Sequence, residues 1–198
     1  MKEEILVVEA GTIKELLAGK PGLKKIEKER IFKLIEKNGQ FKERDEVEHD
    51  ASFKQIIPYI AMYNDADEIL TLRRLKTQSE KRLHNKLSIG VGGHVNLDDS
   101  NIPLEAFKQG MRREIAEEVT VDLIENPEFM GIIYDGSTDV GQVHLGMAYK
   151  VRIVFHGINE ADKFEYFWNS PEELKAHVDD METWSAFLLK ELKMPSQV

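Results

Sequence analysis

The sequence predicts an α/β fold, because segments with the periodicity of strands alternate with segments that have the periodicity of helices. The longest helical segment, residues 103–119, carries an apolar stripe formed by Leu104, Phe107, Met111, Ile115 and Val119. Runs rich in β-branched and aromatic residues, which are typical of strands, lie at residues 55–63, 68–73, 87–95, 128–134, 143–155 and 164–168. A second amphipathic segment, residues 181–192, is expected to be the last helix.

The first 50 residues precede this alternation, and we expect them to form an extension that packs on the main domain, residues 51–198. No linker rich in Pro, Ser or Gly separates the two parts. The elements predicted within the extension are a strand at residues 5–8, a short helix at 12–17 and a charged helix at 23–37.

Two segments before the longest helix carry turn signals. Pro58 has no N–H to donate, so the strand at 55–63 is predicted to be irregular or to lie at an edge of the sheet. Asn64, Asp65 and Asp67 then predict a hairpin to the next strand. The strand at 87–95 breaks into glycines, which let a backbone approach a ligand closely.

Three carboxylates lie on or beside the apolar side of the longest helix. At about 100° per residue, Glu114 and Glu118 project to the side of Phe107 and Met111, and Glu117 flanks them. Such carboxylates are costly to desolvate and repel one another. A hard divalent cation removes both costs, because carboxylate oxygens are its preferred ligands. The helix therefore predicts a site for Mg²⁺ or Mn²⁺.

The same helix resembles the signature of the Nudix family. That signature is a Gly, five residues, a Glu, seven residues, and then Arg-Glu-U-x-Glu-Glu-x-Gly-U, where U is a bulky aliphatic residue. The chain supplies Glu105, seven residues, and then REIAEEVTV at residues 113–121. Eleven residues separate Gly93 from Glu105, which predicts an insertion in the loop at 94–103. Thr120 replaces the last Gly, which predicts a different exit from the helix.

The resemblance implies an α/β/α sandwich on a mixed β-sheet, and metal-dependent hydrolysis of a diphosphate linked to another moiety. The residues that it assigns to the metal are Glu114, Glu117, Glu118 and the carbonyl of Gly92. A cation held there would neutralise phosphate oxygens and activate water for in-line attack.

Two further signature residues have supporting roles in this interpretation. Arg113 is one turn from Glu117, so we expect it to orient that carboxylate. Glu105 is interpreted as a charge at the helix N-terminus or as a brace to the glycine loop.

A basic stretch before the glycine loop is a candidate for binding substrate phosphates, through Arg73, Arg74, Lys81 and Arg82. A solvated loop explains the same charges equally well. The family resemblance also suggests a late glutamate as an extra base, for which Glu160 and Glu165 are candidates by position. His94, beside the glycines, is more often a structural residue than a ligand or base.

Composition narrows the partners and the compartment. The 198 residues carry a net charge of −9, which disfavours binding to a nucleic-acid polymer and leaves a small phosphorylated metabolite as the expected partner. The absence of cysteine excludes disulfides and thiolate ligands. No apolar run or leader points to a membrane, so a cytoplasmic protein is expected. A homodimer is left open.

Two alternatives to a hydrolase remain. The first is a Nudix-like sensor that binds a nucleotide or metabolite without cleaving it, and such proteins usually lose signature glutamates that this chain keeps. The second is the isopentenyl-diphosphate isomerase branch of the superfamily. That branch relies on a catalytic cysteine, and this chain has none.

Overall fold

A mixed β-sheet lies at the centre of the structure, a computed structural model that describes residues 2–75, 86–159 and 161–192. The main path of the sheet is β10-β5-β4-β9-β8-β2, in which β4 and β9 are parallel and the other neighbours antiparallel. Its strands are β1 (Glu4–Glu9), β2 (Gly22–Lys24), β3 (Gln40–Glu43), β4 (Phe53–Tyr63), β5 (Ile69–Arg74), β6 (Leu87–Ser88), β7 (Val119–Leu123), β8 (Glu128–Tyr134), β9 (His144–Ile158) and β10 (Phe164–Asn169).

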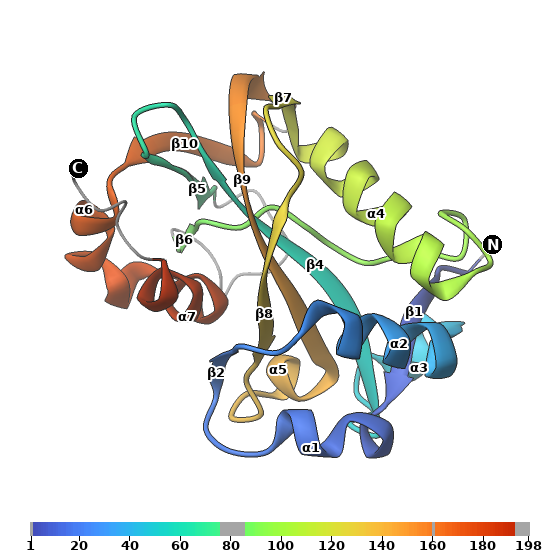
Figure 1. Ribbon diagram of the computed structural model, residues 1–198. Coiled ribbons are helices and arrows are strands. Elements are labelled where there is room, and N and C mark those ends of the chain that lie inside the picture. Colours follow the sequence, from blue (N-terminus) through green and yellow to red (C-terminus); the bar gives the residue numbers. More distant parts are fainter. Residues whose placement is uncertain (1, 76–85, 160, 193–198) are drawn as a thin grey trace.

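Helices cover both faces of this sheet (Figure 1). The longer ones are α2 (Lys28–Asn38) and α4 (Pro103–Glu118) on one face and α7 (Thr183–Glu191) on the other. Shorter helices are α1 (Lys14–Leu17), α3 (Arg44–Val47), α5 (Asp139–Val143) and α6 (Pro171–Lys175), with 3-10 turns at Ala10–Ile13 and Val178–Asp180. This arrangement is the α/β/α sandwich on a mixed sheet that the sequence predicted.

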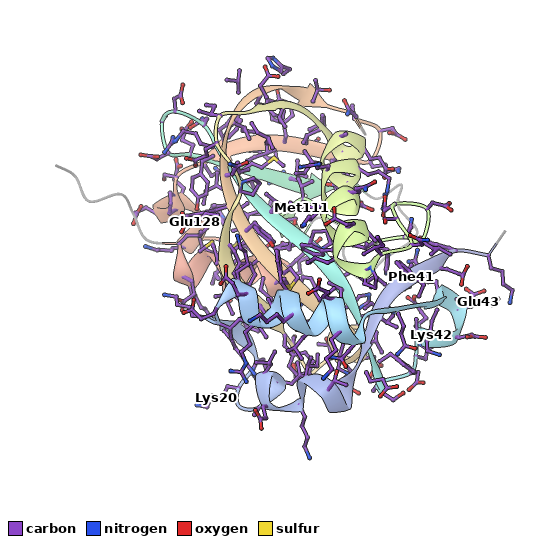
Figure 2. All side chains as sticks on the ribbon, turned by 45° about the vertical axis from the view of Figure 1, so that its right-hand side comes forward. Lys20, Phe41, Lys42, Glu43, Met111 and Glu128 are labelled. Carbon is purple, nitrogen blue, oxygen red and sulfur yellow. The ribbon has the colours of Figure 1, made fainter. Side chains whose placement is uncertain are left out.

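Each face of the sheet has its own hydrophobic core. Under α2 and α4, Phe32 and Phe107 meet edge to face with ring centroids 6.0 Å apart, and side chains fill the space down to the sheet (Figure 2). Under α7, Leu188 and Leu189 pack on the opposite face. β4 serves both cores, because its side chains alternate between the two faces. No helix in the described part of the chain has the length and apolarity needed to cross a membrane.

The first 50 residues share the sheet and a core with the rest of the chain. β1 pairs with β4 through Val7 and Gln55, and β2 pairs with β8. Ile31 and Ile35 of α2 are fully buried in the core that also contains Phe107. The predicted boundary at residue 50 therefore divides the sequence, whereas the residues on its two sides share one hydrophobic core.

Most predicted elements form where they were expected, with three corrections. The strand predicted at 87–95 is limited to β6, Leu87–Ser88, and beyond it the glycine loop forms only isolated bridges, at Val91 and Asn96. The helix predicted at 103–119 is α4, and the strand predicted at 128–134 is β8. The charged helix predicted at 23–37 begins only at Lys28, because residues 22–24 pair with the edge of β8 as strand β2.

The third correction concerns Pro58, since β4 is a central strand and not an edge. On one side β4 pairs with β9 along its length. On the other side the backbone of Ile60 exchanges hydrogen bonds with Val91 of the glycine loop, at 2.9 and 3.0 Å. Pro58 faces the same side as Ile60 because strand residues alternate, so its missing N–H lies opposite the glycines. No ladder hydrogen bond is required there, and the proline is tolerated.

Candidate active site

The glycine loop between β6 and α4 is held by two strands that lie far apart in the chain. Val91 pairs with β4 as described above. Further along the loop, Leu6 N–H of β1 donates to Val95 O at 2.7 Å, and Leu97 N–H donates to Glu4 O at 2.9 Å. The N-terminal segment thus fixes the loop that leads into α4, a contribution that the sequence did not predict.

Both glycines of the turn are closely packed, Gly92 against backbone and Gly93 against a side chain. A Cβ on Gly92 would lie 1.8 Å from Pro58 O, and Gly92 has a φ of +152°, a conformation that residues with side chains rarely adopt. A Cβ on Gly93 would lie 2.4 Å from Glu114 Oε2. The turn therefore brings bare backbone directly against the carboxylate of Glu114.

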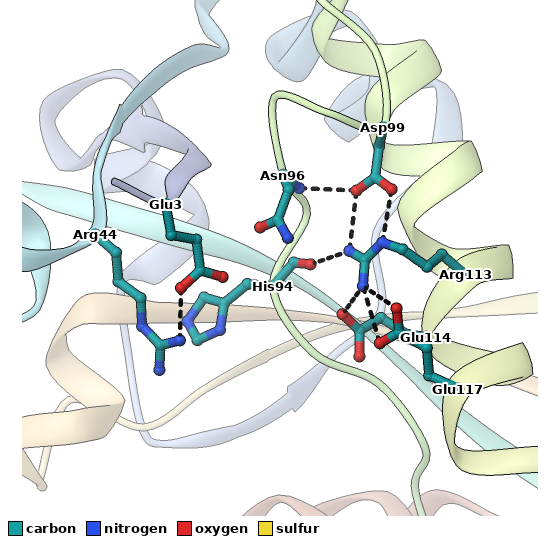
Figure 3. A network of polar contacts seen from close by, with 8 residues as sticks. All are labelled: Glu3, Arg44, His94, Asn96, Asp99, Arg113, Glu114 and Glu117. Carbon is teal, nitrogen blue, oxygen red and sulfur yellow. Dashed lines mark hydrogen bonds and ion pairs between the residues drawn. The ribbon is translucent and has the colours of Figure 1, made fainter. Parts of the chain in front are cut away.

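Arg113 is the shared partner of the polar groups around this turn (Figure 3). Its Nε and Nη2 donate to the two oxygens of Asp99 at 2.7 and 3.0 Å. Its Nη1 donates to Glu114 at 2.7 Å and to both oxygens of Glu117 at 3.2 Å. A further bond joins Nη2 to His94 O at 2.7 Å, which ties the glycine loop to the helix. The contact to Glu117 that the sequence predicted is present, as one of several.

Asp99 is the residue that sequence reasoning missed. It stands six positions after Gly93, which is the spacing that the signature pattern gives between its first Gly and its first acidic residue. Its side chain is only 6% exposed and braces the loop against Arg113. Glu105, predicted as a brace or as an N-terminal charge, lies in the first turn of α4 and pairs with Lys108 at 2.7 Å. Asp99, and not Glu105, therefore braces the glycine loop. With Asp99 at the first acidic position of the signature, the inserted residues follow it, in the segment that leads into α4.

Burial sets the charge states around the loop. Desolvation raises the pKa of the Glu114 carboxyl, and its bond to Arg113 opposes that rise. Burial, with Arg44, His144 and Arg113 nearby, lowers the pKa of His94 to about 3. His94 is therefore neutral, and its Nε2 lies 2.7 Å from Gln55 Oε1. This arrangement fits a structural role for the histidine.

The donor set on α4 fits a hard divalent cation. Glu114 is nearly withdrawn from water with 13% of its side chain exposed, Glu117 is open at 55%, and Glu118 is half-buried. These carboxylates supply oxygen ligands, and the bare backbone of the glycine turn lies beside them. Within the described ranges, however, no three acidic or histidine side chains already form a group able to hold a metal. Arg113 instead holds Glu114 and Glu117.

The exit from α4 explains why Thr120 can replace glycine. Asn159 donates from its backbone N–H to Glu118 O and from Nδ2 to Ala116 O, both at 2.8 Å. Its Oδ1 accepts a bond from Thr120 Oγ1 at 2.7 Å. The helix passes straight into strand β7, whose extended backbone suits a β-branched residue. The different exit that the sequence predicted is thus supplied by Asn159.

The remaining predicted site residues are the phosphate ligands and the extra base. Arg73 of β5 lies opposite Glu165 of β10, with 3.8 Å between Nη1 and Oε2, and its guanidinium stacks over Phe167 at 4.8 Å. A predicted phosphate ligand and a predicted base are thus each other's partners. The side chain of Arg74 and the residues Lys81, Arg82 and Glu160 lie outside the described residues.

Comparison with known proteins decides the family. No family model matches the chain. The chain is 36% identical to Tm1382, a proposed Nudix hydrolase, and the crystal structure of that protein superposes with a TM-score of 0.85 over 95% of this chain and 97% of its own. The chain belongs to the Nudix family.

A second Nudix structure agrees with this assignment at the level of the fold. A Nudix hydrolase from Nitrosomonas europaea, 20% identical, superposes with a TM-score of 0.50 over 70% of this chain and 86% of its own. By sequence, the chain is also 33% identical to Protein YmaB of Bacillus subtilis, in an alignment that covers 74% of each chain. Nudix hydrolases generally use divalent metal ions and act on small phosphorylated substrates.

Proposed function

We propose that this protein is a metal-dependent hydrolase that cleaves a diphosphate linkage in a nucleoside diphosphate derivative or a similar small phosphorylated metabolite. The observation that carries the proposal is the contact of the Glu114 carboxylate with the bare backbone of Gly93, with Glu117 and Glu118 on the next turn of α4. Oxygen donors on a helix and the bare backbone of the glycine turn lie side by side there.

Each residue of the site has its own proposed role. Glu114, Glu117 and Glu118, with the carbonyl of Gly92, would hold Mg²⁺ or Mn²⁺. When bound, the ion supplies charge neutralisation of the diphosphate and a more acidic water molecule. Arg113 positions the carboxylates of Glu114 and Glu117 and is held in turn by Asp99. The lack of side chains at Gly92 and Gly93 lets the turn pack closely against β4 and the Glu114 carboxylate.

Substrate phosphates need positive charge that the chain as a whole does not supply, because its net charge is −9. Arg73, Arg74, Lys81 and Arg82 remain the proposed contacts. For Arg73 this role requires exchange of the exposed Glu165 carboxylate for a phosphate. A bidentate bond to phosphate is strong enough to drive that exchange. Glu165 would then be released, and it stays a candidate for the extra base together with Glu160.

A non-catalytic sensor is the second candidate, and one observation favours it. In the described part of the chain, Arg113 ties up Glu114 and Glu117, and no group of three carboxylates is formed. A sensor would bind a phosphorylated metabolite and leave it intact.

The cytoplasmic location and the homodimer also stay predictions.

A hydrolysis screen separates the two functions. Nucleoside diphosphate derivatives and other diphosphates are incubated with Mg²⁺ or Mn²⁺, and ³¹P NMR identifies the bond that breaks. The proposal expects cleavage within the diphosphate, lost with EDTA and reduced at least about 100-fold by Glu118→Gln. Glu105→Gln, on the same helix but outside the cluster, is the matched control and should retain activity. Tight binding of one compound without turnover of any would establish the sensor.

A further inference from the structure

A cavity of about 380 Å³ lies at the end of the sheet where α1 and α5 meet the ends of β4 and β8, at the bottom of Figure 1. Lys54 of β4 lines this cavity. The next residue, Gln55, bonds to His94 beside the glycine turn. Because strand side chains alternate, Lys54 points to the opposite face of the sheet. The cavity is therefore separate from the glycine turn.

The cavity carries positive charge, although the net charge of the chain is −9. Lys14 of α1 and Lys54 line it, and no carboxylate is among the lining residues that the structure describes. Lys24 brings a third ammonium group near, 5.8 Å from the centre of the Tyr134 ring. That ammonium donates to the carbonyls of residues 16–18, so it holds the end of α1 beside the cavity.

In the described part of the chain, Lys54 is a buried cation that forms no ion pair, with only 3% of the residue exposed. Its Nζ donates to the neutral oxygens Ala51 O and Phe53 O at 2.5 and 3.2 Å, which leaves its third N–H. Asp50 is close enough to act on it electrostatically, but Oδ1 of Asp50 accepts two bonds from Ser52. Burial lowers the pKa of the Lys54 ammonium. A bound anion would offset this cost of burying the charge.

Three more side chains of the lining have donors to offer. Lys14 Nζ, the Tyr134 hydroxyl and the Gln142 amide make no hydrogen bond with the described residues. With Lys54, these donors come from α1, β8, α5 and β4, so they surround the cavity and do not share a plane. A tetrahedral oxyanion accepts bonds from several directions, whereas a planar carboxylate is matched by two donors in its own plane.

We infer that this cavity binds a small tetrahedral oxyanion of the phosphate class, held by Lys14 and Lys54. The volume is within the range of small-molecule sites, roughly 300–1,000 Å³, so a free ion and the phosphate group of a small metabolite both fit. The inference is independent of the proposed function, because neither α4 nor the glycine turn contributes a described residue to the lining.

Calorimetric titration of the metal-free protein with inorganic phosphate tests the inference, in EDTA and at constant ionic strength. Lys14→Met and Lys54→Met each remove one charge and keep an unbranched side chain. Lys20→Met is the matched control, because Lys20 is an exposed lysine that follows α1 outside the cavity lining (Figure 2). We expect one saturable site in the parent and the control, and an affinity weakened by about tenfold or more in the other two variants, because each loses a charge-assisted hydrogen bond.

Backbone amide NMR shows where the phosphate binds. Phosphate should shift the amide signals of Gly136 and Gln142 in the parent and leave those of Gly92 and Gly93 unchanged. Shifts confined to the glycine turn, no saturable binding by the parent, or equal affinity in the parent and Lys14→Met would overturn the inference. Lys14 is exposed, so Lys14→Met keeps the test decisive even if Lys54→Met fails to fold.

Two other ligands test the chemical class. Acetate should bind at least about tenfold more weakly than phosphate, because a planar carboxylate uses fewer of the surrounding donors. Equal affinity for acetate would refute the assignment to a tetrahedral oxyanion. Glycerol 3-phosphate distinguishes the sources of that oxyanion. Tighter binding than inorganic phosphate, lost in Lys14→Met, would support a phosphorylated metabolite as the ligand, and weaker binding would support the free ion.

Discussion

At the level of single residues, Arg113 makes most of the polar contacts around the glycine turn. Its hydrogen bonds with Asp99 raise the pKa of the guanidinium, with Glu114 adding to the effect, so its charge is fixed under all ordinary conditions. Removal of one partner of such a group leaves the other charge unsatisfied, which costs more than the bond itself contributes. The effect of a substitution here therefore depends on how well the partner is buried.

The first prediction compares Asp99→Asn with Glu105→Gln. Asp99 is 6% exposed and bonds to Arg113 twice, whereas Glu105 is 48% exposed and pairs with Lys108. We expect Asp99→Asn to lose roughly 1–3 kcal/mol of stability in urea unfolding and about 10- to 100-fold in activity. Glu105→Gln should change stability by less than about 0.5 kcal/mol. A larger loss of stability and activity in Glu105→Gln than in Asp99→Asn would show that Glu105 occupies the first acidic position of the signature.

The second prediction concerns His94 and pH. Its pKa is 6.5 in the unfolded chain and about 3 in the folded protein. Below about pH 6.5 the unfolded state takes up the proton first, so stability is full above this pH and falls as the pH drops towards 3. The loss due to this residue at about pH 5 is roughly 1–2 kcal/mol.

Urea unfolding at about pH 7 and about pH 5 measures that loss. His94→Gln keeps a hydrogen-bonding group toward Gln55 but cannot titrate, so it should lose less stability than the parent between the two values. An identical loss in parent and variant would show that His94 does not carry this pH dependence.

At the level of elements, the glycine loop is a bridge between β4, β1 and α4. Beyond the side-chain bonds of Arg113 and Asp99, backbone contacts set its geometry, since Leu6 N–H and Glu4 O bond to it and Pro58 O packs against Gly92. A change in any of these segments should therefore reach the signature helix through the backbone of the loop.

The third prediction tests this dependence with two matched glycines. Gly92 and Gly157 have φ values of +152° and +159°, so alanine is strained to a similar extent at both. A Cβ at Gly92 would meet Pro58 O at 1.8 Å, whereas at Gly157 nothing lies within 4 Å. Gly92→Ala should cost about 1–3 kcal/mol more than Gly157→Ala in urea unfolding and should also lower activity. Equal costs would show that the close approach to β4 is unimportant.

At the level of the whole molecule, local signals predicted the elements, and long-range pairing decided the site. α4 and its glutamates could be predicted because the periodicity and the signature lie within one segment. The role of Asp99 could not, because it appears only when the loop folds back on Arg113. The proline rule failed at Pro58 because it assumes a regular neighbouring strand, and the neighbour here is a glycine loop.

Two further features show the same limit. The first 50 residues gave no functional signal, yet Glu4 and Leu6 hold the glycine loop through backbone bonds that no side-chain pattern reveals. Arg73 and Glu165 were assigned separate roles from their positions in the sequence. The antiparallel register of β5 and β10 instead places them opposite each other, and that register depends on tertiary pairing.

Titration with Mn²⁺ shows whether the glutamates of α4 hold a divalent cation. The electron paramagnetic resonance signal of free Mn²⁺ is followed while protein is added, for the parent, Glu117→Gln, Glu118→Gln and the control Glu105→Gln. We expect one saturable site in the parent and the control, and an affinity weakened by at least about tenfold in the other two variants. Unchanged Mn²⁺ affinity in both Glu117→Gln and Glu118→Gln would contradict a metal site at these glutamates.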